Sequence, residues 1–162
     1  MLERDVVVVG AGPVGLAAAL AVRATGRAVT VIEAGALDRV RPGSRAIFIH
    51  RATLQILERI RPRLGYTLAS HGLAWSTKRT FYRGKQVYRR RYSPRGIELL
   101  PAATSLPQVV TERVLHDACV AAGVEFVWNV EVTTAAPSSG RVRIESAGSA
   151  IALARYVIGA DG

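Results

Sequence analysis

The stretch that decides the fold is Val6-Val7-Val8-Val9-Gly10-Ala11-Gly12-Pro13-Val14-Gly15. Four valines in a row predict a strand that is buried on both faces, as in a parallel sheet. The G-x-G-x-x-G turn leads directly into the apolar run of residues 16–22, which predicts a helix over residues 13–24. Three spaced glycines are weak evidence alone, but a strand before them and a helix after them indicate a dinucleotide-binding turn.

Each glycine of this turn has a physical role in binding a dinucleotide. Gly10 permits the tight turn, Gly12 lets the backbone approach a pyrophosphate, and Gly15 allows the helix to pack on the strand. The phosphates then lie on free N–H groups at the positive end of the helix. The expected phosphate-binding residues are Gly10, Ala11, Gly12, Pro13, Val14 and Gly15.

The second predicted strand, residues 28–33, ends in an acidic residue. It follows the helix stop signal Thr25-Gly26 and ends at Glu33. A carboxylate at this point accepts hydrogen bonds from both ribose hydroxyls of an adenosine and repels a 2′-phosphate. The sequence therefore favours FAD or NAD over NADP, and the alternative is a solvent-exposed glutamate at a strand end.

Composition limits the classes of protein that need to be considered. A chain of 162 residues fits one domain with a real core. Its single cysteine, Cys119, excludes an intramolecular disulfide, which suits a reducing cytoplasm. The charged residues 3–5 do not fit a signal peptide, and no apolar run approaches the ~20 residues that span a bilayer. We therefore expect a cytoplasmic protein that does not bind membranes.

The chain is strongly basic, with a net charge of +10 and a pI near 11.0. Such a balance is compatible with nucleic-acid binding, with an anionic dinucleotide ligand, or with a fragment whose acidic remainder is absent. No nucleic-acid module or aromatic stacking platform is recognised, so the dinucleotide is favoured. His50, His71 and His116 lack metal-ligand spacing, and we expect no metal site.

The rest of the chain predicts further α/β structure. A loop rich in Gly, Pro and Arg over residues 34–44 leads through an extended segment, 45–49, to a helix over about 51–60. Within residues 71–100, three segments are typical of a meander that forms a substrate-facing β segment inserted in the fold. These segments are residues 73–77, 80–83 and 86–89.

The C-terminal part predicts a helix followed by strands. Leu106-Pro107 is expected to start the helix over residues 108–122. A strand at 124–128 follows, and three further strands form an antiparallel meander packed on the main sheet. These three strands are residues 130–134, 141–146 and 150–158. The predicted fold class is α/β, a doubly wound, mostly parallel sheet in one incomplete domain, residues 1–162.

Taken in order, these motifs resemble the N-terminal FAD-binding portion of class A FAD-dependent aromatic monooxygenases, the p-hydroxybenzoate hydroxylase type. The resemblance covers essentially the whole chain. Its parts are the glycine turn with Glu33, Ser44-Arg45-Ala46 followed by residues 51–57, Leu106-Pro107-Gln108, and Val157-Ile158-Gly159-Ala160-Asp161-Gly162.

The resemblance implies further cofactor-binding residues. Glu33, with Ala34 beside it, would hold the FAD ribose, and Arg45 would lie near the diphosphate. Gln108 would reach the ribityl or phosphate region, Val132 would offer its backbone to the adenine, and Asp161 is associated with both FAD and the nicotinamide cofactor. Alternatively, Arg45 is one of many surface arginines, Gln108 a first-turn polar residue, and Asp161 a strand-end cap.

The implied function is hydroxylation of an aromatic or polyketide-like small molecule with FAD, NAD(P)H and O₂, with the catalytic residues unknown. Family members continue past the Asp-Gly motif to a Gly-Asp motif, so we expect this chain alone to be incomplete and inactive, with a possible complementary chain. The terminal strand, 156–160, is then expected to leave a sheet edge open to association. The alternatives are a non-catalytic or degenerate dinucleotide-binding module and an NAD-binding oxidoreductase domain.

Overall fold

The computed structural model describes residues 2–39, 46–92 and 100–162. The chain divides into two compact units, each described here by itself. The first unit contains Met1–Gly43 and Glu112–Gly162, and the second contains Ser44–Thr111. None of the described helices is long and apolar enough to cross a membrane.

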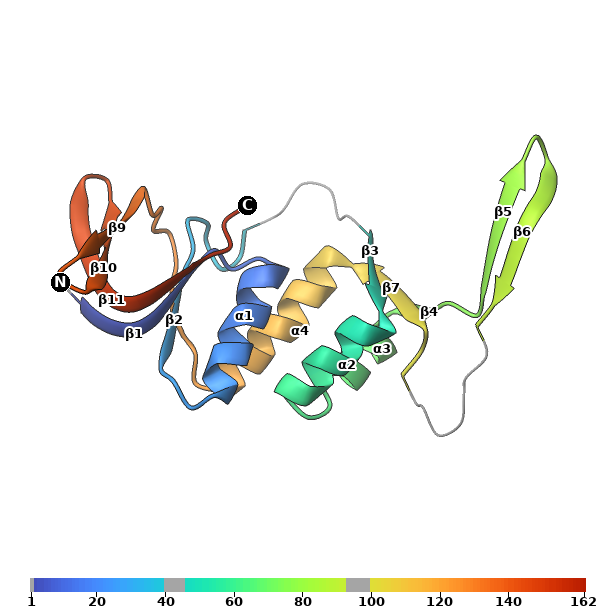
Figure 1. Ribbon diagram of the computed structural model, residues 1–162, viewed down its shortest axis with the longest axis horizontal. Helices are drawn as coiled ribbons and strands as arrows, with labels where there is room; N and C mark the ends of the chain where they lie inside the picture. Colours follow the sequence, from blue (N-terminus) through green and yellow to red (C-terminus); the bar gives the residue numbers. More distant parts are fainter. Residues whose placement is uncertain (1, 40–45, 93–99) are drawn as a thin grey trace. The chain divides into compact units, whose positions relative to one another are not determined.

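The first unit is built on a six-stranded sheet with the order β8-β2-β1-β11-β10-β9. The first four strands of this order run parallel, and β10 and β9 continue the sheet antiparallel (Figure 1). The strands are β1 Leu2–Val9, β2 Val29–Ile32, β8 Glu125–Val127, β9 Thr134–Ser138, β10 Arg141–Ser146 and β11 Ser149–Gly159. The predicted α/β class with a mostly parallel sheet is confirmed.

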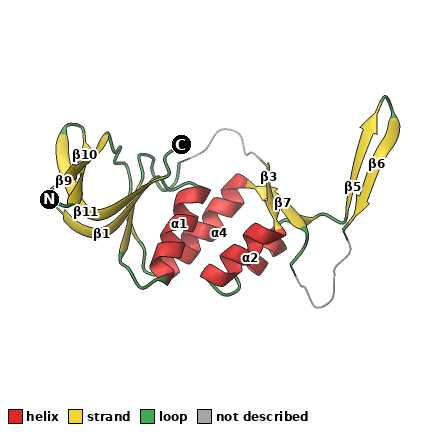
Figure 2. Cartoon of the chain, in the orientation of Figure 1, coloured by secondary structure: helices red, strands yellow, loops and turns green. Residues whose placement is uncertain are grey.

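Two helices accompany this sheet. α1 is Pro13–Ala24, as predicted, and α4 is Gln108–Ala121, which begins in the second unit. α1 and α4 lie side by side (Figure 2), and the Cys119 thiol donates to the Leu16 carbonyl at 3.4 Å. Cys119 is fully buried and is a small residue of the core.

The valine run forms the centre of the core. Val7 and Val8 are fully buried because β1 lies between β2 and β11 and alternate side chains point to opposite faces of the sheet. Val7 packs in a cluster with Ile32 and Ile144. Burying each such side chain contributes about 1.5–3 kcal/mol, so this run stabilises the sheet from both sides.

The strand predicted over residues 130–134 is not present. β9 begins only at Thr134 and contains Pro137, which lies between two of the predicted strands. A proline lacks an N–H but is tolerated in β9 because this strand is the outermost one of the sheet. The turn between β9 and β10 lies at residues 139–140 instead, where Ser139 and Gly140 both have positive φ.

The three-stranded antiparallel meander is present, but it continues the main sheet instead of packing on it. β11 pairs with β10 along residues 149–154 and with β1 along residues 152–159. In the strand expected at a sheet edge, 156–160, residues 156–159 pair with β1 and lie beyond the residues that pair with β10. One side of this segment is therefore open within the described sheet, as expected. The outer strands of the described sheet are β8 and β9.

The second unit contains a small sheet and a separate hairpin. The sheet has the order β3-β7-β4, and β5 pairs with β6. The helices and strands of the second unit are β3 Ala46–His50, α2 Arg51–Ile60, α3 Leu64–His71, β4 Leu73–Ala74, β5 Thr77–Tyr82, β6 Lys85–Arg91 and β7 Ala103–Pro107. The helix predicted over 51–60 is confirmed.

The meander expected across residues 73–89 is confirmed for its second and third strands, which pair antiparallel as β5 and β6, and is wrong for its first strand. β4 pairs antiparallel with β7, a strand that was not predicted from the sequence. β5 and β6 form an exposed basic hairpin. β7 is held by burial of Ala103, Thr104 and Leu106, and it ends at Pro107, so α4 starts at Gln108. Pro107 thus ends β7 and lies directly before α4, so the helix predicted over residues 108–122 is confirmed.

The helix α3 also has no counterpart in the sequence analysis, because its start depends on a side chain from α2. The Glu58 carboxylate accepts hydrogen bonds from the N–H groups of Arg63, at 2.7 Å, and Gly65, at 3.1 Å. A Cβ at Gly65 would overlap the Leu54 carbonyl oxygen, so glycine allows α2 and α3 to pack closely.

Replacing Val31 by alanine should lower the free energy of unfolding by about 2 kcal/mol, because a fully buried site loses two methyl groups and keeps a cavity. The matched control is Val120→Ala, at a side chain that is 55% exposed, with an expected change below about 0.5 kcal/mol. Urea denaturation followed by circular dichroism measures both. Equal losses would contradict the placement of β2 in the core.

Candidate functional site

The turn between β1 and α1 contains three glycines, and the space around a side chain differs at each of the three positions. Gly10 has φ +102°, and a Cβ there would lie 2.5 Å from the Ala160 carbonyl oxygen. A Cβ at Gly15 would overlap the Gly10 carbonyl oxygen. A Cβ at Gly12 would meet nothing within 4 Å. The packing of the chain therefore requires glycine at positions 10 and 15, whereas position 12 faces open space.

The N-terminus of α1 is suited to an anion. Gly12 is the N-cap and Pro13 follows it, with neither a capping side-chain hydrogen bond nor an acidic residue in the first turn. The N–H groups at the start of a helix have no partner within the helix, and the helix dipole is positive there. The protein thus leaves these backbone donors for another group, as phosphate-binding helices do.

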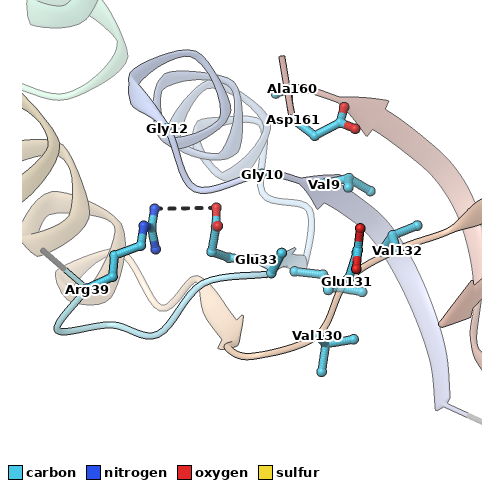
Figure 3. A pocket seen from close by; sticks show the side chains of 12 residues that line it. Val9, Gly10, Gly12, Glu33, Arg39, Val130, Glu131, Val132, Ala160 and Asp161 are labelled. Carbon is cyan, nitrogen blue, oxygen red and sulfur yellow. Dashed lines mark ion pairs between the residues drawn. The ribbon is translucent and has the colours of Figure 1, made fainter. Parts of the chain in front are cut away.

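A cavity of about 520 Å³ lies at the carboxyl ends of β1, β2 and β11. This edge of a parallel sheet is where nucleotides bind in open α/β folds. Figure 3 shows the twelve lining residues, which come from three strand ends and two loops. They are Val9, Gly10, Gly12, Ile32, Glu33, Ala34, Arg39, Val130, Glu131, Val132, Ala160 and Asp161.

Glu33 is held in one orientation at the end of β2. Its Oε2 accepts a hydrogen bond from the Ala11 N–H at 2.6 Å, and its Oε1 accepts one from the Gly35 N–H at 3.0 Å. Arg39 Nη2 lies 3.5 Å from Oε2 (Figure 3), and the glutamate side chain is 14% exposed. The carboxylate therefore connects the glycine turn to the loop after β2 and lies in the wall of the cavity.

The wall opposite the glycine turn is the segment that follows β8. Glu33 N–H donates to the Val127 carbonyl at 2.9 Å, and Val130 N–H donates to the Glu33 carbonyl at 3.0 Å. Asn129 between them has φ +60° and donates its N–H to Gly35. This backbone ladder brings residues 130–132 to the cavity, where a strand had been predicted.

The ionisable side chains of the cavity wall are mainly acidic, although the chain carries a charge of +10. Glu33, Glu131 and Asp161 contribute carboxylates, and among the lining residues only Arg39 is basic. Attraction for an anion at this site must therefore come from backbone N–H groups, the dipole of α1 and Arg39. Much of the positive charge lies in the exposed β5–β6 hairpin of the other unit.

The structure brings together half of the residues predicted for the site. Those that line the cavity are Gly10, Gly12, Glu33, Ala34, Val132 and Asp161. Ala11, Pro13, Val14 and Gly15 belong to the same turn without lining it, and Ala11 is bound to Glu33. Arg45 lies outside the described residues, and Gln108 is the first residue of α4, in the second unit. Their roles stay predictions.

Sequence reasoning missed Arg39 and Glu131. Arg39 lies in the loop over residues 34–44, whose Gly-, Pro- and Arg-rich composition does not single out one arginine. Glu131 was assigned to a strand that is not there. Within the described part of the chain, no group of three or more His, Cys, Asp or Glu side chains could hold a metal ion.

A family model described as the FAD binding domain matches residues 3–162. No curated protein sequence matches the chain. Many solved structures do, among them p-nitrophenol 4-monooxygenase PnpA from Pseudomonas putida DLL-E4, with a TM-score of 0.83 and 24% identity over 100% of this chain and 42% of that chain.

Two further structures have a similar fold. The flavin-dependent monooxygenase PieE, in complex with FAD and substrate, has a TM-score of 0.76 and 22% identity over 99% of this chain and 30% of that chain. OxyS anhydrotetracycline hydroxylase from Streptomyces rimosus has a TM-score of 0.77 and 25% identity over 99% of this chain and 32% of that chain. The chain thus spans well under half the length of these proteins.

Gly15→Ala should lower the free energy of unfolding by about 3 kcal/mol, because the added methyl group overlaps the Gly10 carbonyl and overpacks the turn. Gly12→Ala adds the same group to open space and should cost less than about 1 kcal/mol, the typical loss of N-cap preference. Chemical denaturation of the two variants compares them. A larger loss at position 12 would show that this turn is packed differently.

Proposed function

This chain belongs to the FAD binding domain family, and we propose that its cavity binds the adenosine and diphosphate part of FAD. The observation that carries the proposal is the position of the Glu33 carboxylate, held by Ala11 and Gly35 beside the uncapped N-terminus of α1. A ribose acceptor and a phosphate site in one cavity are the two requirements of an adenine dinucleotide.

The residues present fit this part of FAD. The diphosphate would lie on the first-turn N–H groups of α1, where Gly12 leaves the space that a side chain would fill. The ribose hydroxyls would donate to Glu33, and the adenine would lie against residues 130–132. Asp161 lines the same cavity from the end of β11, in the Asp-Gly motif. When bound, FAD supplies the redox chemistry, and these residues bind and orient it.

For the protein as a whole, the proposed activity is hydroxylation of an aromatic or polyketide-like small molecule with NAD(P)H as reductant. The support comes from the names of the structural neighbours, which are a p-nitrophenol monooxygenase, a flavin-dependent monooxygenase and an anhydrotetracycline hydroxylase. The match covers 30–42% of those chains, so the substrate pocket of this protein is not assigned.

A second candidate ligand is NAD, because a carboxylate at Glu33 serves the ribose of NAD as well as that of FAD. The two differ in the group beyond the diphosphate. Direct titration with both dinucleotides therefore separates an FAD-binding domain from an NAD-binding oxidoreductase domain.

Titration of the purified chain with FAD, NAD, 5′-AMP and 2′,5′-ADP should give the tightest binding for FAD. We expect 2′,5′-ADP to bind roughly tenfold more weakly than 5′-AMP, from which it differs only by the 2′-phosphate, because that phosphate faces the Glu33 carboxylate. Fluorescence and calorimetry measure the dissociation constants. Equal or tighter binding of 2′,5′-ADP would overturn the role of Glu33, and tighter binding of NAD would favour the second candidate.

Gly12→Val should weaken FAD binding by about a hundredfold while the fold is retained, because its side chain occupies the path of the diphosphate. Gly12→Ala, with one methyl group, should lose less. The comparison uses calorimetry for affinity and circular dichroism for the fold. Unchanged FAD affinity in a folded Gly12→Val variant would place the diphosphate elsewhere.

A further inference from the structure

Arg39 is a fixed side chain in the cavity wall. Its Nη2 lies 3.5 Å from Glu33 Oε2, and its Nη1 donates to the Ala36 carbonyl at 3.1 Å. The side chain also crosses Gly35, where a Cβ would lie 2.5 Å from Arg39 Cδ. Only 22% of the side chain is exposed, so the guanidinium is held next to the position proposed for the ribose.

The Arg39 guanidinium packs against an aromatic stack formed by Trp128 and Phe126. The Arg39 guanidinium carbon lies 5.7 Å from the centroid of the Trp128 ring, within the range of a cation–π interaction. Trp128 stacks on Phe126 with centroids 5.3 Å apart and planes at 4°, and His116 of α4 packs against both rings. The stack therefore fixes the position of the charge relative to β8 and α4.

Glu33 does not depend on Arg39 for its orientation. The N–H groups of Ala11 and Gly35 each donate to one of its carboxylate oxygens, at 2.6 and 3.0 Å. Loss of the arginine would thus leave the carboxylate in place while removing the positive charge that balances it. An unbalanced carboxylate repels a second anion more strongly than a paired one does.

We propose that Arg39 sets how strongly this site discriminates against a phosphate on the ribose 2′-hydroxyl of a bound adenine nucleotide. The proposal rests on the nucleotide site proposed above. Glu33 selects a free 2′-hydroxyl, and Arg39 limits that selection by offsetting the glutamate charge, so the site tolerates a 2′-phosphate better than Glu33 alone would. An arginine near the ribose is also the group that accommodates a 2′-phosphate in other dinucleotide sites.

The test compares ADP-ribose with 2′-phospho-ADP-ribose, which differ only in the 2′-phosphate. Calorimetry gives the dissociation constant of 2′-phospho-ADP-ribose divided by that of ADP-ribose, for the unmodified chain and for Arg39→Gln. Glutamine is shorter than arginine and keeps a hydrogen-bond donor but removes the charge. We expect this ratio to rise by about tenfold in Arg39→Gln, as for one charge acting over several ångströms in a partly buried site. Binding of ADP-ribose itself should change much less.

Two controls accompany this variant. Arg39→Lys keeps the charge and should leave the ratio within about threefold of its original value, since the Coulomb contribution depends on charge more than on shape. Arg155→Ala removes one positive charge from an exposed side chain that does not line the cavity, and it should leave the ratio unchanged. Thermal melts show that each variant is folded.

The outcomes separate the inference from the proposed function. If both ligands lose affinity equally in Arg39→Gln, or if the ratio does not change, Arg39 has only a structural role and the inference is wrong. A fall in the ratio would also overturn it. If the unmodified chain binds neither ligand while it is folded, the nucleotide site itself is wrong, and the inference fails with it.

Discussion

The close approach of three backbone segments is the constraint on which the site depends. The Gly10 turn lies against the Ala160 carbonyl, and the start of α1 lies against the Gly10 carbonyl at Gly15. Any side chain at position 10 or 15 would separate these segments. Because they meet, the ends of β1 and β11 and the N-terminus of α1 converge, and the cavity forms where they do. The binding surface is thus a direct product of backbone packing.

The charge of the site is set by placement and not by composition. The chain has a net charge of +10, yet the cavity wall contains three carboxylates and one arginine among its lining side chains. Helix α1 supplies positive potential through its dipole and its first N–H groups. A basic composition alone suggested an anionic partner, but it did not indicate where in the chain an anion would be bound.

The second unit illustrates how pairing depends on contacts that are distant in sequence. The residues of β4 through β6 have strand character, and their existence as strands was predicted. The pairing of β5 with β6 was predicted too, but the partner of β4 was not, because β4 pairs with β7 some thirty residues later. α3 was missed for a different reason. Its first N–H groups are satisfied by Glu58 of the preceding helix, a contact that no local pattern reports.

The sequence by itself determined the segment from β1 through α1 and β2 to Glu33. Its valines, glycines and terminal acid act through neighbours close in the chain, so their order and spacing carry the information. Only the tertiary structure decided that β11 pairs with both β1 and β10, that residues 130–132 line the cavity, and that Arg39 lies between Glu33 and Trp128. Trp128 and Arg39 are far apart in the sequence, and neither has a local signature. Their meeting follows from the parallel pairing of β2 with β8, which brings the ends of these two strands together.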